Sequence, residues 1–159
     1  MQQTVSISDA KVSNSASDVL VTYSLGSCIG VAVWDPMIPC AGLLHFQLPT
    51  GTLDPERAKS KPLMFGDTGL AWLITEMEKK GANRKRLKVK LAGGAKMFED
   101  KSSTFDIGKR NHTSIRKALW QLGLFVSAEE IGGNIPRTVY QNVTDGKTIL
   151  KRSGETVEL

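Results

Sequence analysis

Two segments of this chain repeat apolar residues with the period of an α-helix, and they limit the possible folds more than any other feature. Each has apolar residues at positions i, i+3, i+4 and i+7, which form one face of a helix. They are Leu70, Leu73, Ile74 and Met77 in the first segment and Ile115, Ala118, Leu119 and Leu122 in the second. The expected N-cap is Asp67 or Thr68 for the first helix and Asn111 for the second.

The other apolar segments are short, rich in β-branched residues and bounded by turn residues, which is typical of strands. The expected strands are Thr4–Ile7, Val19–Ser24, Ile29–Trp34, Gly42–Leu48, Leu87–Leu91, Phe125–Ala128, Arg137–Val143 and Thr148–Lys151. Consecutive strands with short links pair antiparallel, and strands joined through a helix can run parallel. The sequence therefore predicts an α/β (α+β) fold, a layered sandwich of a mixed β-sheet with at least one helix on each apolar sheet face.

Length and composition narrow the class of protein. A chain of 159 residues favours one domain over residues 1–159, with a loose tail from about Ser153. No apolar run reaches the length of a membrane span and the first residues do not resemble a secretory signal, so we expect a cytoplasmic protein without membrane insertion. The net charge is +5, but the basic clusters are short and have few aromatic residues between them, so we expect no nucleic-acid partner.

The chain contains two cysteines and two histidines. Two cysteines do not form a disulfide framework. Cys28, Cys40, His45 and His112 lack the closely spaced pairs that zinc sites use, so we expect neither a metal nor a cofactor.

Cys28 stands between two glycines in the stretch LGSCIG, residues Leu25–Gly30. Glycine lets another backbone or a ligand approach closely, which suits a thiol that has to be reached. A cysteine in an apolar run is also often a small packed hydrophobe, and a histidine in such a run can be a core residue. The residues alone leave both interpretations open.

The turn at Asp35–Pro39 relates Cys28 to a histidine in the next strand. If Trp34 pairs with Cys40, then Cys28 lies opposite Phe46, and a shift of one residue brings it opposite His45. Directly opposed side chains are close enough to interact.

A thiol beside an imidazole has the chemistry of a nucleophile with its acid–base partner. The thiolate is the reactive form, so neighbouring groups should favour ionisation of the Cys28 thiol. His45 would protonate a leaving group and later activate water. The backbone N–H groups of Gly26 and Ser27 are candidates for holding an oxyanion of the substrate.

The stretch VTYSLGSCIGVAVWDP, followed by GLLHFQLP, resembles the chemoreceptor glutamine deamidases of bacterial chemotaxis, the CheD family. Further similar stretches are LAGGAKMF at Leu91–Phe98, IGKRN at Ile107–Asn111 and EEIGGNIPRTVY at Glu129–Tyr140. They follow one another in the family's order and cover most of the chain.

The resemblance implies a Cys-His-Thr triad of Cys28 as nucleophile, His45, and Thr22 as the residue that orients the imidazole. It also implies a fold similar to the deamidating cytotoxic necrotizing factors. Members hydrolyse glutamine side chains of methyl-accepting chemoreceptors to glutamate, and some bind the phosphatase CheC. The alternative function is a non-catalytic binding or regulatory module that docks on chemoreceptors or on CheC.

Overall fold

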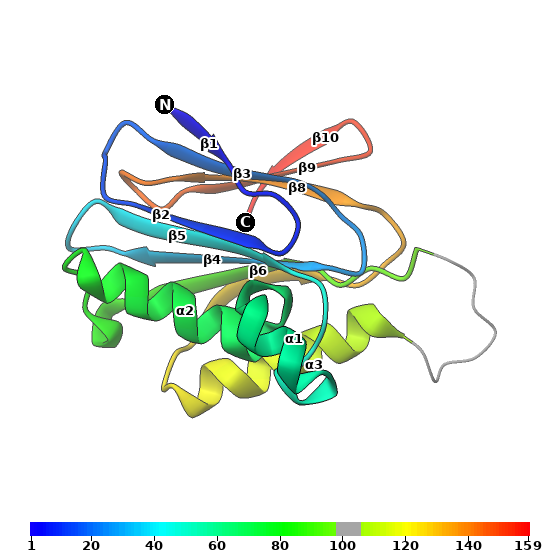
Figure 1. Ribbon diagram of the computed structural model, residues 1–159. Coiled ribbons are helices and arrows are strands. Elements are labelled where there is room, and N and C mark those ends of the chain that lie inside the picture. Colours follow the sequence, from blue (N-terminus) through cyan, green and yellow to red (C-terminus); the bar gives the residue numbers. More distant parts are fainter. Residues whose placement is uncertain (98–105) are drawn as a thin grey trace.

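The computed structural model describes residues 1–97 and 106–159, in which two mixed β-sheets and a set of helices form three layers (Figure 1). The outer sheet has the order β1 (Gln2–Thr4), β3 (Val19–Leu25), β8 (Arg137–Asn142), β9 (Thr148–Arg152), β10 (Glu155–Glu158). The central sheet has the order β2 (Asp9–Ser13), β5 (Cys40–Phe46), β4 (Ile29–Asp35), β6 (Lys88–Gly93), β7 (Val126–Ile131).

The helices lie on the face of the central sheet that points away from the outer sheet (Figure 1). They are α1 (Pro55–Ser60), α2 (Gly66–Lys79) and α3 (Ile107–Gln121), with short 3-10 turns at Gly51–Leu53, Pro62–Met64 and Arg84–Arg86. None of the helices in the described part of the chain is both long and apolar enough to cross a membrane.

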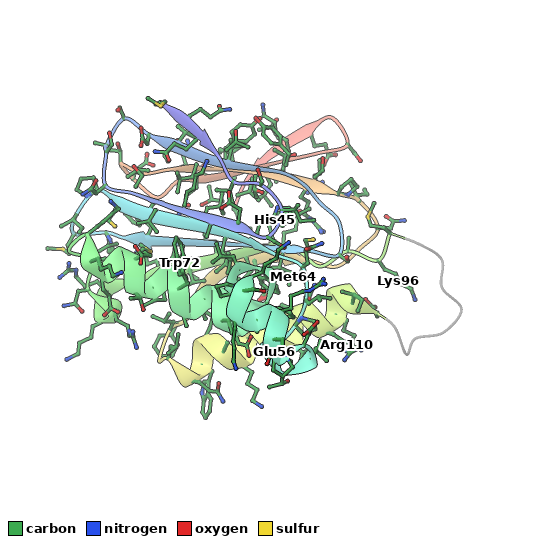
Figure 2. The ribbon with its side chains drawn as sticks, in the orientation of Figure 1. His45, Glu56, Met64, Trp72, Lys96 and Arg110 are labelled. Atoms are coloured by element: carbon green, nitrogen blue, oxygen red, sulfur yellow. The ribbon has the colours of Figure 1, made fainter. Side chains whose placement is uncertain are left out.

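Strand β5 of the central sheet is buried along its whole length, because helices cover one of its faces and the outer sheet covers the other. Leu44 and Phe46 pack with the helices, whereas Ala41 and Leu43 pack with the outer sheet. Side chains alternate between the faces of a strand. His45 therefore points into the layer between the two sheets, where Figure 2 shows it.

Several expected pairings are confirmed. Strands β4 and β5 form an antiparallel pair, and so do β8 and β9. Strands β6 and β7 are joined through α3 and run parallel. The coarse prediction of a layered α+β fold is thus correct.

The number of sheets and the position of the helices differ from the prediction. The consecutive strands β3 and β4 do not pair but belong to different sheets, and the chain crosses between the sheets at residues 26–28. The apolar face of the outer sheet is covered by the central sheet, so in the described residues helices cover only one sheet face.

Three predicted segments are corrected. The first strand ends at Thr4 and a separate strand, β2, follows it. Helix α1 lies in a segment that is outside the predicted helices and strands, and Asp54 caps it by accepting a hydrogen bond from the Arg57 N–H. The expected loose tail instead forms β10, which pairs antiparallel with β9.

The predicted helix caps are also wrong. Helix α2 follows Phe65, which provides no side-chain cap, and the Asp67 carboxylate accepts hydrogen bonds from Thr50 and from the Gly51 and Thr68 N–H groups. Asp106 caps α3, so Asn111 lies inside that helix. Phe98, the last residue of one motif, lies outside the described residues.

Candidate active site

A β-bulge follows Thr22 in β3, and the Thr22 side chain lies in the layer between the sheets. The pairing of β3 with β8 shifts between Thr22 and Leu25, and Ser24 adopts a φ of 55°. A bulge adds one residue to a strand, and a left-handed residue is uncommon outside glycine. Because of the extra residue, Thr22 and Leu25 are both buried although three positions separate them. The chain then leaves the outer sheet and enters the segment that carries Cys28.

Thr22 and His45 meet across the two sheets. The Thr22 Oγ1 lies 2.7 Å from the His45 Nδ1 and donates a hydrogen bond to the Val5 carbonyl oxygen at 2.8 Å. His45 is only 4% exposed. The contact expected between Thr22 and the imidazole is therefore present, and the catalytic role of both residues stays a prediction.

The hydrogen bonds of Thr22 determine which nitrogen of His45 carries the proton. A hydroxyl has a single hydrogen, and a carbonyl oxygen can only accept. Since Thr22 gives its hydrogen to Val5, it accepts from His45, and the Nδ1 must carry the imidazole hydrogen. The Nε2 then has a free lone pair. It is buried and has no hydrogen-bond partner in the described residues.

Burial keeps the imidazole neutral. It lowers the pKa of His45 to about 4, and the nearby Asp9 carboxylate opposes that shift. Asp9 lies directly opposite His45 in the pairing of β2 with β5. At neutral pH the Nε2 is consequently unprotonated, which is the state that a general base requires.

Cys28 is a partly exposed free thiol that packs against the apolar cluster between the two sheets, on the side to which His45 points. The predicted pairing is wrong by one residue: Trp34 pairs with Ala41 and Gly30 lies opposite His45. Cys28 stands two residues before Gly30, just outside β4, and is therefore not the direct strand partner of His45.

Burial raises the pKa of the Cys28 thiol, and a hydrogen bond from its own backbone N–H only partly opposes this shift. The expectation that the surroundings favour the thiolate is therefore wrong. Cys28 and His45 are both neutral at neutral pH.

Three consecutive carbonyl groups hold the segment from Gly26 to Cys28 in place. The Gly26 oxygen accepts from the Ala95 N–H at 2.8 Å and the Cys28 oxygen from the Gly94 N–H at 2.9 Å. The Ser27 oxygen accepts from the side chain of Asn111 at 2.9 Å. We refer to these three residues as the crossover segment.

Gly93 allows the crossover segment to lie this close to β6. It has a φ of 114°, and a Cβ built on it would come within 2.3 Å of the Cys28 carbonyl oxygen. Any larger residue would displace the backbone of Cys28. The sequence motif contains Gly93, but only the structure reveals which backbone it accommodates.

The N–H groups of Gly26 and Ser27 are available for the predicted oxyanion site. Among residues 1–97 and 106–159, no oxygen accepts a hydrogen bond from either of them. Two donors directly before the predicted nucleophile are suited to a developing negative charge.

The other cysteine and the other histidine lie elsewhere. Cys40 is fully buried at the far end of β5, on the side of the helices. The His112 Nε2 lies 2.7 Å from a Glu129 carboxylate oxygen. Within the described ranges, no group of three or more histidine, cysteine, aspartate or glutamate residues is arranged to hold a metal ion.

We expect iodoacetamide to alkylate Cys28 and not Cys40 in the folded protein, because only Cys28 is exposed. Burial raises the pKa of Cys28, so the rate should increase with pH through a midpoint above the ~8.5 of a free cysteine. Peptide mass spectrometry after short exposures from about pH 6 to about pH 10 measures this rate. A rate that is already maximal at neutral pH would indicate a stable thiolate and contradict the conclusion that the Cys28 thiol is neutral at that pH.

Comparisons with known proteins identify similar sequences. The family model described as "CheD chemotactic sensory transduction" matches residues 47–152, more than half of the chain. The "Probable chemoreceptor glutamine deamidase CheD" of Solibacter usitatus is 43% identical over 155 residues, which are 98% of this chain and 91% of the relative. The "Probable chemoreceptor glutamine deamidase CheD 1" of Syntrophus aciditrophicus is 45% identical over 150 residues, which are 94% of this chain and 93% of the relative.

Proposed function

The chain belongs to the CheD family, and from this premise we propose that it deamidates glutamine side chains of methyl-accepting chemoreceptors. The observation that carries the proposal is the unprotonated His45 Nε2, which has no hydrogen-bond partner among the described residues and lies in the layer between the two sheets, at whose border Cys28 packs. The two relatives are both named as chemoreceptor glutamine deamidases, which supplies the class of substrate.

The first chemical step forms a thioester. The His45 Nε2 takes the proton of the Cys28 thiol as the sulfur attacks the carboxamide carbon of the glutamine side chain. The C–N bond then breaks, and the imidazolium returns the proton to the leaving nitrogen, which departs as ammonia. No separated thiolate has to exist beforehand, which suits a raised pKa of Cys28 and a lowered pKa of His45.

The second step is hydrolysis of the thioester. Water loses a proton to the His45 Nε2 and attacks the acyl carbon, and the C–S bond breaks. The proton returns to the sulfur, which leaves glutamate and a neutral thiol. In both steps the N–H groups of Gly26 and Ser27 stabilise the oxyanion, and Thr22 keeps the Nδ1 protonated.

Basic side chains on the helix side of the central sheet support a protein substrate with acidic surfaces. Lys109, Arg110 and Lys117 line a cavity of about 690 Å³ beside α3, together with Asp67 and Pro49. Positive charge of this kind speeds the approach of an acidic partner and is screened by salt.

The proposed function predicts selective deamidation of an intact receptor fragment. Contacts remote from the reacting amide help to position it, and free glutamine lacks them. We expect ammonia release from the fragment to exceed that from free glutamine, at matched glutamine concentration, by at least about tenfold. Mass spectrometry should locate a gain of about 1 Da at particular glutamines, the mass difference between an amide and an acid, and the rate should fall with salt.

Equal turnover of free glutamine would instead indicate a small-molecule glutaminase. A fragment that binds but is never deamidated would favour the alternative function, a regulatory module that docks on receptors or on the CheC phosphatase.

A further inference from the structure

Two buried amide side chains have similar surroundings but lie in different parts of the fold. Asn111 in α3 is fully buried and Gln141 in β8 is 1% exposed. The amide nitrogen of Asn111 donates to two backbone carbonyl oxygens, and that of Gln141 donates to one. The amide oxygen of each is buried and has no partner in the described residues. Gln141 contacts Val33, at the opposite end of β4 from the crossover segment.

Asn111 connects the two segments that carry Cys28 and His45. Its Nδ2 donates one hydrogen bond to the Ser27 oxygen and one to the Gln47 oxygen, both at 2.9 Å. Ser27 directly precedes Cys28, and Gln47 follows His45 by two residues. An amide NH₂ has two hydrogens, and this bridge uses both of them.

The start of α3 packs closely against its neighbours, so Asn111 has a defined position relative to both segments. A Cβ built on Gly108 would come within 2.4 Å of the Gly94 carbonyl oxygen, which shows how closely the helix abuts β6 and the residues after it. One turn after Asn111, the Ser114 Oγ donates to the Pro49 oxygen at 2.6 Å. Helix α3 thus contacts the residues after β6 through Gly108 and the residues after β5 through Ser114.

We propose that Asn111 is a positioning residue that sets the placement of the Cys28 thiol relative to the His45 imidazole. Its effect on turnover rests on the proposed function, whereas its effect on the thiol does not. A buried amide oxygen without a partner costs free energy. The Asn111 amide oxygen carries this cost, and its amide nitrogen bridges the two segments whose side chains, Cys28 and His45, have to be aligned.

The test compares Asn111→Ala, which loses two hydrogen bonds to backbone carbonyl oxygens, with Gln141→Ala, which also removes a buried amide and loses one such bond. Both variants should lose thermal stability. Only Asn111→Ala should lower kcat, by about 10²-fold, since a misplacement of about 1 Å can cost this much, while KM stays within about twofold. Alkylation of Cys28 by iodoacetamide at neutral pH should become several times faster in Asn111→Ala only, because release of the crossover segment exposes the thiol.

Asn111→Asp keeps the size of the side chain. It provides a second test of the proposal, which is available even if Asn111→Ala does not fold. A buried carboxyl group next to two carbonyl oxygens has a raised pKa and can donate a hydrogen bond only when it is protonated. Turnover by this variant should therefore recover partly as the pH is lowered, whereas wild-type turnover should not.

Wild-type kcat and wild-type alkylation in Asn111→Ala would overturn the proposal, and so would equal losses of kcat in the Ala variants of Asn111 and Gln141. If the wild-type protein deamidates no receptor, the proposed function fails, and the alkylation rates of the Ala variants still decide whether Asn111 positions Cys28.

Discussion

Replacing Cys28 with alanine is expected to reduce ammonia release to the background level, a loss of about 10⁴-fold or more. Alanine offers no atom that can form the thioester. The side chain is partly exposed at the border of the apolar cluster, so its loss should leave the fold intact. Ammonia release from a receptor fragment, together with the thermal unfolding temperature, measures both parts of the expectation.

Cys40→Ala is the matched control. Cys40 is fully buried among core residues on the other face of the central sheet, so its truncation should cost about 1 kcal/mol of stability and leave turnover unchanged at temperatures where the variant is folded. Full activity of Cys28→Ala, or loss of activity only in Cys40→Ala, would refute the assignment of the nucleophile.

His45→Gln is expected to lower kcat/KM by about 10²–10⁴-fold, because glutamine cannot take up and return a proton. In the wild-type protein, kcat/KM should decline as the pH falls toward about 4, the pKa to which burial lowers His45. Protonation of the Nε2 removes the base, so the loss lies on the acid side. A pH profile of both proteins on a receptor fragment tests this, and a wild-type rate that increases below pH 5 would contradict a neutral base.

Thr22 variants separate orientation of the imidazole from packing. Thr22→Ala should lose less activity than His45→Gln, since it removes the hydrogen-bond partner of Nδ1 and leaves the base in place. Thr22→Ser restores the hydroxyl and should recover much of the loss. If the serine and alanine variants are equally impaired while both are folded, the β-branched shape of Thr22 matters, and its hydroxyl does not.

The sequence predicted the individual elements better than their arrangement into layers. Apolar periodicity indicated α2, α3 and most strands, because burial of one face leaves that pattern in any fold. It did not reveal that β3 and β4 belong to different sheets, since a short link between two strands is equally compatible with a hairpin and with a crossover. Strand β10 escaped prediction because Glu155–Glu158 is polar and only partly buried.

The candidate site was predictable as a set of residue types but not as geometry. The glycines around Cys28 and the histidine in the next strand suggested the chemistry. The tautomer of His45 depends on the Val5 carbonyl group, which no side-chain pattern encodes. Asn111 resembled a helix cap because asparagine is common at caps, and its contact with Ser27, 84 positions away, is visible only in the folded chain.

The position of the candidate site between two sheets bears on when the chain becomes reactive during synthesis. Cys28, His45 and Thr22 all lie in the first third of the sequence and leave the ribosome early. Thr22, however, belongs to β3, whose antiparallel neighbour β8 begins only at Arg137. The hydrogen bond to the Ser27 carbonyl oxygen can form only after Asn111 has been synthesised. Pairings between distant parts of a chain form late. If the proposed function holds, a nascent chain carries the proposed nucleophile before the proposed base is aligned with it, and deamidation begins only when the fold is complete.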